Sequence, residues 1–451
     1  MRSYYSCIRN MIKSYKILTR YRTLGILSSA LNRKHETFMD TRGIINYMNY
    51  SKSKGNFIFD MDGKSYLDLF CQVASMPLGY NHPALTHWAN NFVKEYLDHL
   101  INRPALGFFP SEKFVEMAHR TLLPIAPSGL SKVVLTTGGG SDAVEAAIKT
   151  VLYWEYKNNR NTNINPKILS FKNSYHGRYL SSLSVTGTNE NQKKGIPLFP
   201  WPSTTFPIRL YPNVSINLSH NKHLEEFCLD KVECLCRKNS ETLTPIRGII
   251  VEPIQSEGGD MYASPEFFRE LRTICTDWNA LFLVDEVQTG MSTGKQWAHE
   301  SWELDDPADI VIFAKKMQIS GIYIKPELEP LYERSLGTTW QGDVIRLSML
   351  ETILKVIKDE KLFKNSIKTG NYLLQEAGKI KQIQNLRGEG SMIAFSIQNM
   401  ENTKARELLS DRGIIVGICG QNTIRLRPSL VLKKKECDEF LKILKEISSL
   451  E

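Results

Sequence analysis

The sequence lacks several features that would place it in a special class of protein. No stretch of about 18 consecutive apolar residues occurs in its 451 residues, so a membrane-spanning helix is not expected. The eight cysteines are too few for a disulfide scaffold in a chain of this length, and none forms a Cys-x-x-Cys pair. With 42% hydrophobic and 23% charged residues, the composition is that of a folded globular protein.

The first 35 positions contain no acidic residue. Glu36 is the first of the 48 acidic residues in the chain. Residues 1–34 hold eight of the 57 basic residues, which leaves 49 basic against 48 acidic residues in the rest of the chain. The net charge of +9 therefore belongs mostly to one terminus, and no nucleic-acid partner is expected. A basic, acid-free N-terminus with interspersed apolar residues is typical of an organelle import peptide. We expect residues 1–39 to be a mitochondrial transit peptide or a basic tail, and the mitochondrial matrix to be the location.

Short apolar runs alternate with amphipathic helices over residues 130–325. The runs are at 133–135, 167–171, 248–252, 281–287 and 309–313, and the clearest helices are at 142–157 and 265–278. This pattern predicts a mostly parallel sheet that is covered by helices on both faces.

The rest of the chain predicts smaller elements. A hairpin is expected at 57–70, a loop rich in Pro and Asn at 197–222, and a C-terminal amphipathic helix near 440–447. The fold class is α/β, with a large domain at 101–330 and a small α+β domain at 331–451. Residues 40–100 are expected to contribute to the small domain.

A glycine-rich turn, TTGGGSDAVEAAIK, follows the first apolar run and opens a helix. Free backbone amides and the positive end of a helix suit a phosphate, although the glycines alone could serve only a tight turn. Gly138, Gly140 and Ala143 match a loose dinucleotide fingerprint, but residues 171–173 at the end of the second strand include no acid for a ribose. A phosphate without a ribose is the better interpretation.

Other polar residues lie where strands leave the core. Asp285 and Gln288 follow one run, and Lys315 and Lys316 follow the next; taken singly, each is an ordinary cap, ion-pair member or surface charge. Ligands bind at the carboxyl ends of parallel strands, so these residues are expected to meet. A phosphate cradle, an acid, a lysine and an aromatic ring such as Tyr175 are the components of a pyridoxal 5′-phosphate (PLP) site.

Longer motifs point to a family. GGGSDAVEAAIK, SYHGR, EPIQSEGGD, LVDEVQTG, FAKKM and GTTWQGD occur in this order, and the chain resembles class III (subgroup II) aminotransferases over about residues 45–450. DEVQTGMSTGKQWAHESW and TIRLRPSLV are similar to eukaryotic members that act on 4-aminobutyrate (GABA). The resemblance implies PLP-dependent transferase fold type I, a homodimer with a shared active site, and a two-stage ping-pong transfer from GABA to 2-oxoglutarate that yields succinic semialdehyde and glutamate.

The resemblance also implies roles in cofactor binding. Lys316 would be the lysine that binds the cofactor covalently and moves the proton, with Lys315 as a rival that the sequence does not exclude. Asp285 would pair with the ring nitrogen, and Gln288 would reach the ring hydroxyl. The remaining expected cofactor residues are Gly140 and Ser141 for the phosphate, Thr339 of the partner subunit for the same phosphate, and Tyr175 stacked on the ring.

Two arginines and one acid would select the substrate. Arg178 could bind the distal carboxylate of both GABA and glutamate, and Arg425 the α-carboxylate of glutamate or 2-oxoglutarate. With GABA bound, Arg425 would face no anion, and an unpaired buried charge costs on the order of 3–5 kcal/mol. Glu257 can cancel that charge and move aside when glutamate arrives.

Departures from the family leave alternatives open. Animal members carry a cysteine pair near the phosphate turn that supports an iron–sulfur cluster, whereas TGGGSD contains no cysteine, so we expect no cluster and no metal site. Ser320-Gly321 stands where a glycine pair is usual. A lysine, ornithine or β-alanine transaminase is the runner-up. A dinucleotide oxidoreductase is disfavoured because it leaves Lys316 and Asp285 without a role.

Overall fold

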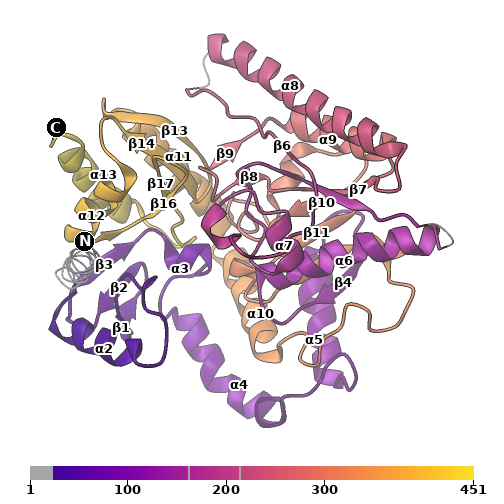
Figure 1. Ribbon diagram of the computed structural model, residues 1–451. Helices are drawn as coiled ribbons and strands as arrows, with labels where there is room; N and C mark the ends of the chain where they lie inside the picture. Colours follow the sequence, from indigo (N-terminus) through magenta and orange to yellow (C-terminus); the bar gives the residue numbers. More distant parts are fainter. Residues whose placement is uncertain (1–23, 161–162, 213–214, 451) are drawn as a thin grey trace, which may run out of the picture.

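The computed structural model describes residues 24–160, 163–212 and 215–450 (Figure 1). Residues 1–23, and with them most of the expected import peptide, lie outside the described residues. No helix in the described part of the chain is both long enough and apolar enough to cross a membrane.

The second half of the expected N-terminal tail is folded onto the body. Helix α2 (Ile26–Glu36) begins at the Asp62 carboxylate, which accepts hydrogen bonds from the backbone nitrogens of Leu27 (2.8 Å) and Ser28 (3.1 Å). A Cβ at Gly25 would collide with the same carboxylate, so the close approach needs glycine. The folded body therefore begins well before residue 40.

A seven-stranded sheet forms the centre of the molecule. Its order is β4-β12-β11-β10-β7-β5-β6. The strands are β4 (Lys132–Leu135), β12 (Gly321–Ile324), β11 (Ile310–Phe313), β10 (Leu281–Asp285), β7 (Ile246–Val251), β5 (Lys167–Phe171) and β6 (Ser203–Thr204). All five predicted runs are strands, and the predicted α/β class is confirmed. Only β12 is antiparallel to its neighbours, β11 and β4.

Two hydrophobic clusters cover the two faces of this sheet. Along β10, Leu281 and Leu283 face the cluster that contains α6 (Gly140–Asn158), whereas Phe282 and Val284 face the opposite cluster. This alternation is the two-residue period of a strand buried on both faces. The opposite cluster is built by α4 (Pro83–Asn102), α5 (Glu112–Leu122), α8 (Ser215–Ser240), α9 (Pro265–Asp277) and α10 (Val344–Asp359). The prediction of a loop over residues 197–222 is wrong for residues 215–222, which form the start of α8.

An N-terminal and a C-terminal part of the described chain lie side by side, because β15 pairs with β3 (Figure 1). An N-terminal sheet contains β1 (Met48–Lys54), β2 (Phe57–Asp60), β3 (Ser65–Asp68) and, parallel to β3, β15 (Ile414–Ile415). A C-terminal sheet has the order β13-β14-β17-β16. It comprises β13 (Ile383–Glu389), β14 (Met392–Ile397), β17 (Thr423–Leu426) and β16 (Gly417–Cys419), with α11 (Leu362–Ala377), α12 (Asn402–Asp411) and α13 (Lys434–Ser448) beside it. The domain boundaries stay a prediction.

Candidate active site

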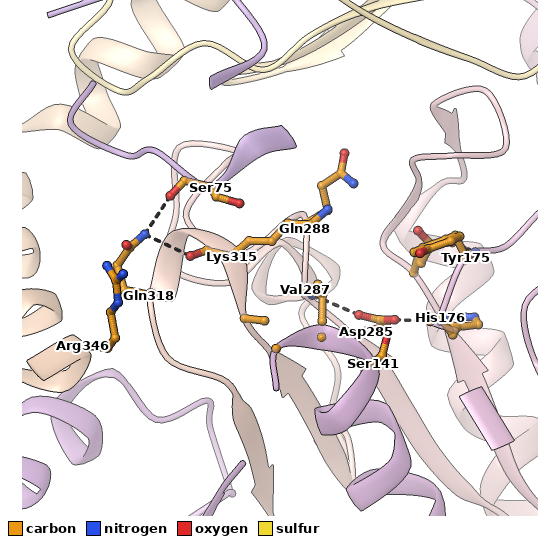
Figure 2. A pocket seen from close by; sticks show the side chains of 15 residues that line it. Ser75, Ser141, Tyr175, His176, Asp285, Val287, Gln288, Lys315, Gln318 and Arg346 are labelled. Carbon is orange, nitrogen blue, oxygen red and sulfur yellow. Dashed lines mark hydrogen bonds and ion pairs between the residues drawn. The ribbon is translucent and has the colours of Figure 1, made fainter. Parts of the chain in front are cut away.

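A cavity of about 460 Å³ lies at the carboxyl ends of β10 and β11, beside the N-terminus of α6 (Figure 2). Its lining includes five of the predicted site residues: Gly140, Ser141, Tyr175, Asp285 and Gln288. Its volume is in the range of about 300–1,000 Å³ that is typical of small-molecule sites. The strand-end argument therefore located the cavity correctly.

The glycine turn forms the end of the cavity beside α6. A Cβ at Gly140 would lie 2.7 Å from a methyl group of Val287, so only glycine fits between the turn and the loop after β10. The backbone nitrogens of residues 137–138 already donate to the Asp142 carboxylate at 2.8 Å. The first amides of α6 remain for a phosphate, and the Ser141 hydroxyl, whose oxygen accepts from the backbone nitrogen of Arg178 at 3.2 Å, keeps its hydrogen to donate.

Asp285 is the last residue of β10 and is almost fully buried. One carboxylate oxygen lies 2.7 Å from Nδ1 of His176, and the other accepts a hydrogen bond from the backbone nitrogen of Val287 at 3.0 Å. These contacts hold the carboxylate at the cavity wall, as Figure 2 shows. A fixed acid in this position suits a protonated ring nitrogen.

The two adjacent lysines, of which Lys316 is expected to hold the cofactor, occupy different environments. Lys315, with a φ of +50°, lines the cavity with Asp285. Lys316 is 1% exposed, is not part of the lining, and donates from Nζ to the hydroxyl of Ser292 at 2.9 Å. Burial lowers the pKa of Lys315 to about 8 and that of Lys316 to about 7. The lysine that faces the cavity is Lys315.

Glu257 and Arg425 form the predicted ion pair. Nη2 of Arg425, at the end of β17, lies 2.7 Å from a carboxylate oxygen of Glu257. The arginine side chain is 4% exposed and that of the acid is 25% exposed. Nε and Nη1 of Arg425 are buried without a hydrogen-bond partner in the described part of the chain. Two spare donors beside one movable acid suit an incoming carboxylate.

Five predicted site residues lie outside the cavity lining: Lys316, Glu257, Arg425, Arg178 and Thr339. Arg178 is exposed and donates from Nε to the hydroxyl of Tyr175 at 2.9 Å, which places it at the rim. Thr339 lies in an exposed loop at 329–343. Thr339 is expected to contact the active site of a second subunit, and this role stays a prediction.

Sequence reasoning missed several residues of the lining, and Glu252 is the acid among them. Its carboxylate accepts hydrogen bonds from the backbone nitrogens of Tyr175 (3.0 Å) and Ser256 (3.3 Å). Burial, reinforced by the nearby Asp285, raises the pKa of Glu252 well above its ordinary value. Glu252 ends the apolar run GIIVE, so the strand-end rule could have identified it. His176, within SYHGR, could have been recognised only by its contact with Asp285.

Comparison with known proteins identifies the family. Residues 39–448 match the family described as aminotransferase class-III. This chain belongs to the class III aminotransferases. Class III aminotransferases depend on PLP, and the family likeness covers both the cavity and the surrounding fold.

Several relatives of this class III aminotransferase carry an assigned activity. The mitochondrial 4-aminobutyrate aminotransferase of Sus scrofa is 37% identical over 94% of this chain and 89% of the relative. The 4-aminobutyrate aminotransferase of Dictyostelium discoideum is 38% identical over 92% of this chain and 88% of the relative. Among solved structures, a lysine aminotransferase from M. tuberculosis has a TM-score of 0.82 at 29% identity and covers 92% of this chain and 98% of that one.

The residues of the cavity fit PLP. A phosphate can lie at the N-terminus of α6, where a side chain at Gly140 would not fit. Asp285 offers an anion to the ring nitrogen, and Lys315 offers a buried amine to the aldehyde. Arg425, which is close enough to Lys315 to lower its pKa, keeps buried, unpaired donors that suit an anion.

Proposed function

We propose that this class III aminotransferase transfers the amino group of GABA to 2-oxoglutarate and releases succinic semialdehyde and glutamate. Relatives with 4-aminobutyrate aminotransferase activity at 37–38% identity support the substrate. The observation that carries the proposal is the pair of Glu257 and Arg425, in which the arginine keeps two unpaired donors. Such a pair can serve substrates with one and with two carboxylates.

The cofactor residues follow from the cavity. Lys315, rather than Lys316, would hold the cofactor covalently, because it lines the cavity with Asp285 whereas Lys316 is bonded to Ser292. Bound PLP supplies an aldehyde that accepts the substrate amine and an electron-withdrawing ring. Asp285 would keep the ring nitrogen protonated, and Gly140 and Ser141 would bind the phosphate. Tyr175 would contact the ring, and Gln288 would donate to the ring oxygen.

Substrate selection uses two arginines with different surroundings. Arg178, at the rim beside Tyr175, binds the carboxylate that GABA and glutamate share, the one remote from the reacting amine. Arg425 binds the second carboxylate of glutamate or 2-oxoglutarate. During the GABA half-reaction Glu257 remains on Arg425 and neutralises it; when a dicarboxylate arrives, Glu257 moves toward solvent.

Lys315 moves the proton. Its lowered pKa of about 8, caused first by burial, leaves part of the amine neutral near pH 7. A neutral amine can take a proton from the substrate carbon that carries the nitrogen. It can then return that proton to the cofactor carbon that was the aldehyde carbon, which is a 1,3-shift. Arg425 lowers and Glu257 raises the pKa of the same lysine, so the switch also influences the base.

Assembly and location extend the proposal. We place Thr339 of the partner subunit at the phosphate, which makes the enzyme a homodimer with shared sites. Mitochondrial relatives and the acid-free N-terminus support import into the matrix. Because α2 is packed on Asp62, the removable presequence would end before residue 24. Mass spectrometry of the protein from mitochondria tests this boundary.

A panel of amines with 2-oxoglutarate tests the function. GABA, β-alanine, lysine and ornithine are each supplied to the purified protein, and the glutamate and the aldehyde formed are measured. The proposal predicts the highest kcat/KM for GABA. The lysine aminotransferase among the structural relatives makes lysine the second candidate, and a higher kcat/KM for lysine would reassign the substrate. Membership of the aminotransferase family sets the dinucleotide oxidoreductase aside.

A further inference from the structure

A second arginine of TIRLRP, Arg427, lies beside the site and has no role in the proposed chemistry. Its side chain is fully buried, as is that of its partner Asp260. Nη2 of Arg427 lies 2.5 Å from Asp260, and its Nε donates to the side-chain oxygen of Gln288 at 2.9 Å. Burial opposes the charge of Arg427, but the carboxylate of Asp260 outweighs it and raises its pKa. The guanidinium therefore stays charged.

This contact determines which end of the Gln288 amide is available. A guanidinium N–H can only donate, so the amide oxygen of Gln288 must face Arg427. The amide NH₂ is then the end left for the cavity, which Gln288 lines. An NH₂ group donates, as the negatively polarised ring oxygen of PLP requires. A rotated amide would instead present its oxygen to another oxygen.

We propose that Arg427 and Asp260 are positioning residues that hold the Gln288 amide with its donor toward the cofactor. Asp260 fixes the guanidinium, and the guanidinium fixes the amide. The inference rests on the proposed role of Gln288 in binding the cofactor. It assigns control of cofactor affinity, exerted through Gln288, to a closed ion pair whose two residues do not line the cavity.

A neighbouring arginine provides a matched control. Arg387 is also buried and contacts the same loop, since its Nε donates to the backbone oxygen of Asp260 at 2.8 Å and it also donates to the backbone of Gly259. It makes no hydrogen bond with Gln288. A substitution at Arg387 therefore disturbs the loop without releasing the amide.

The test compares single and paired substitutions. Arg427→Met leaves Asp260 buried without a partner and can fail to fold. The double variant Arg427→Met/Asp260→Asn removes both charges, and asparagine is tolerated at the positive φ of position 260, +54°. Thermal unfolding reports stability. Titration of the apoenzyme with PLP gives the dissociation constant, and the absorption spectrum of the bound cofactor is followed against pH.

The proposal predicts that the double variant regains stability relative to Arg427→Met but still binds PLP about tenfold more weakly, the effect of about one charge-assisted hydrogen bond. The pH dependence of the cofactor spectrum shifts as well. Gln288→Leu produces the same loss, and adding the double variant to Gln288→Leu produces no further loss. Arg387→Met lowers the unfolding temperature but leaves PLP affinity and the spectrum unchanged.

Recovery of PLP affinity together with stability in the double variant would overturn the proposal, because the ion pair would then be only structural. An equal loss of PLP affinity in Arg387→Met would overturn it as well. Failure of the wild-type protein to bind PLP or to transaminate GABA would instead refute the proposed function. The two failures are therefore distinguishable.

Discussion

Two neighbouring arginine–carboxylate pairs, Arg425 with Glu257 and Arg427 with Asp260, differ in their exposure and in the number of unpaired donors they keep. Arg425 and Arg427 are two residues apart at the end of β17, so both side chains point to the same face and reach the loop at 257–260. The pair of Arg425 and Glu257 retains a quarter-exposed acid and unpaired arginine donors, whereas the pair of Arg427 and Asp260 is fully buried. One pair can open and the other cannot.

The difference shows that neighbouring residues at the end of one strand can serve two purposes. Arg425 belongs to an ion pair that is proposed to open, and Arg427 to one that is proposed to hold Gln288 in place. Opening an ion pair requires that the released acid reach water and that the arginine find another anion. Only Glu257 meets the first condition, and of the two arginines only Arg425 has unpaired donors for another anion. The adjacent lysines repeat the contrast, since Lys315 faces the cavity and Lys316 is bonded to Ser292.

The largest expected effect separates the two lysines. Lys315→Ala is expected to lower kcat by at least about 1,000-fold, because the proton would lose its acceptor. Lys316→Ala should retain the cofactor linkage. Reduction with borohydride followed by peptide mapping locates the linkage. A cofactor found on residue 316 would reverse the assignment.

Breaking the closed pair should cost the most stability. Arg427→Met is expected to reduce the free energy of unfolding by about 3–5 kcal/mol, because Asp260 keeps a buried charge without a partner. Arg425→Met should cost less than about 1 kcal/mol, since Glu257 can turn to water. Denaturant unfolding of both variants measures the two values. Equal losses would remove the distinction between the pairs.

Removing the arginine of the open pair, Arg425, should weaken catalysis with 2-oxoglutarate but not with GABA. Arg425→Met is expected to lower kcat/KM for 2-oxoglutarate about 100-fold, the effect of about 2–3 kcal/mol of lost charge-assisted hydrogen bonding. The GABA half-reaction should change little, because GABA has no second carboxylate. Single-turnover measurements with each substrate separate the two. Parallel losses for both substrates would contradict the assigned role.

The open pair also influences Lys315 through charge. With a pKa of about 8, the neutral fraction of Lys315 in the apoenzyme rises about tenfold between pH 7 and pH 9, so the rate of cofactor uptake should rise by the same factor. Because the pKa lies below the ordinary 10.5, the protonated lysine disfavours folding below about pH 8, and this penalty fades as the pH rises toward 10.5. A pH-independent uptake rate in stopped-flow measurements would exclude Lys315 as the titrating group.

Much of this site could be predicted from the sequence, because strand ends in a parallel sheet converge. That rule located Asp285, Gln288 and the phosphate turn. The choice between Lys315 and Lys316 could not be made, since the positive φ that directs Lys315 into the cavity belongs to a short turn with no sequence signal. Strand β12 was missed because its antiparallel pairing with β4 depends on tertiary contacts.

A second group of features was beyond sequence reasoning because tertiary contacts create them. Residues 71–74 form a left-handed turn with four positive φ values and none of them is glycine, a conformation that the sequence disfavours. A tertiary contact fixes the residue that follows this turn: the Gln318 side chain donates to the backbone oxygen of Ser75 at 2.7 Å. The closed pair of Arg427 and Asp260 joins positions 167 residues apart, and nothing in either segment predicts it.

The switch is tested most directly by the two half-reactions of Glu257→Ala. The account predicts that the rate constant for GABA falls at least about 100-fold, because the nearly buried Arg425 is left without its neutralising acid, and an unpaired buried charge costs about 3–5 kcal/mol. The glutamate rate constant should be unchanged or higher, because no acid has to move aside. An unchanged GABA rate constant together with an unchanged preference between the two substrates would contradict the switch.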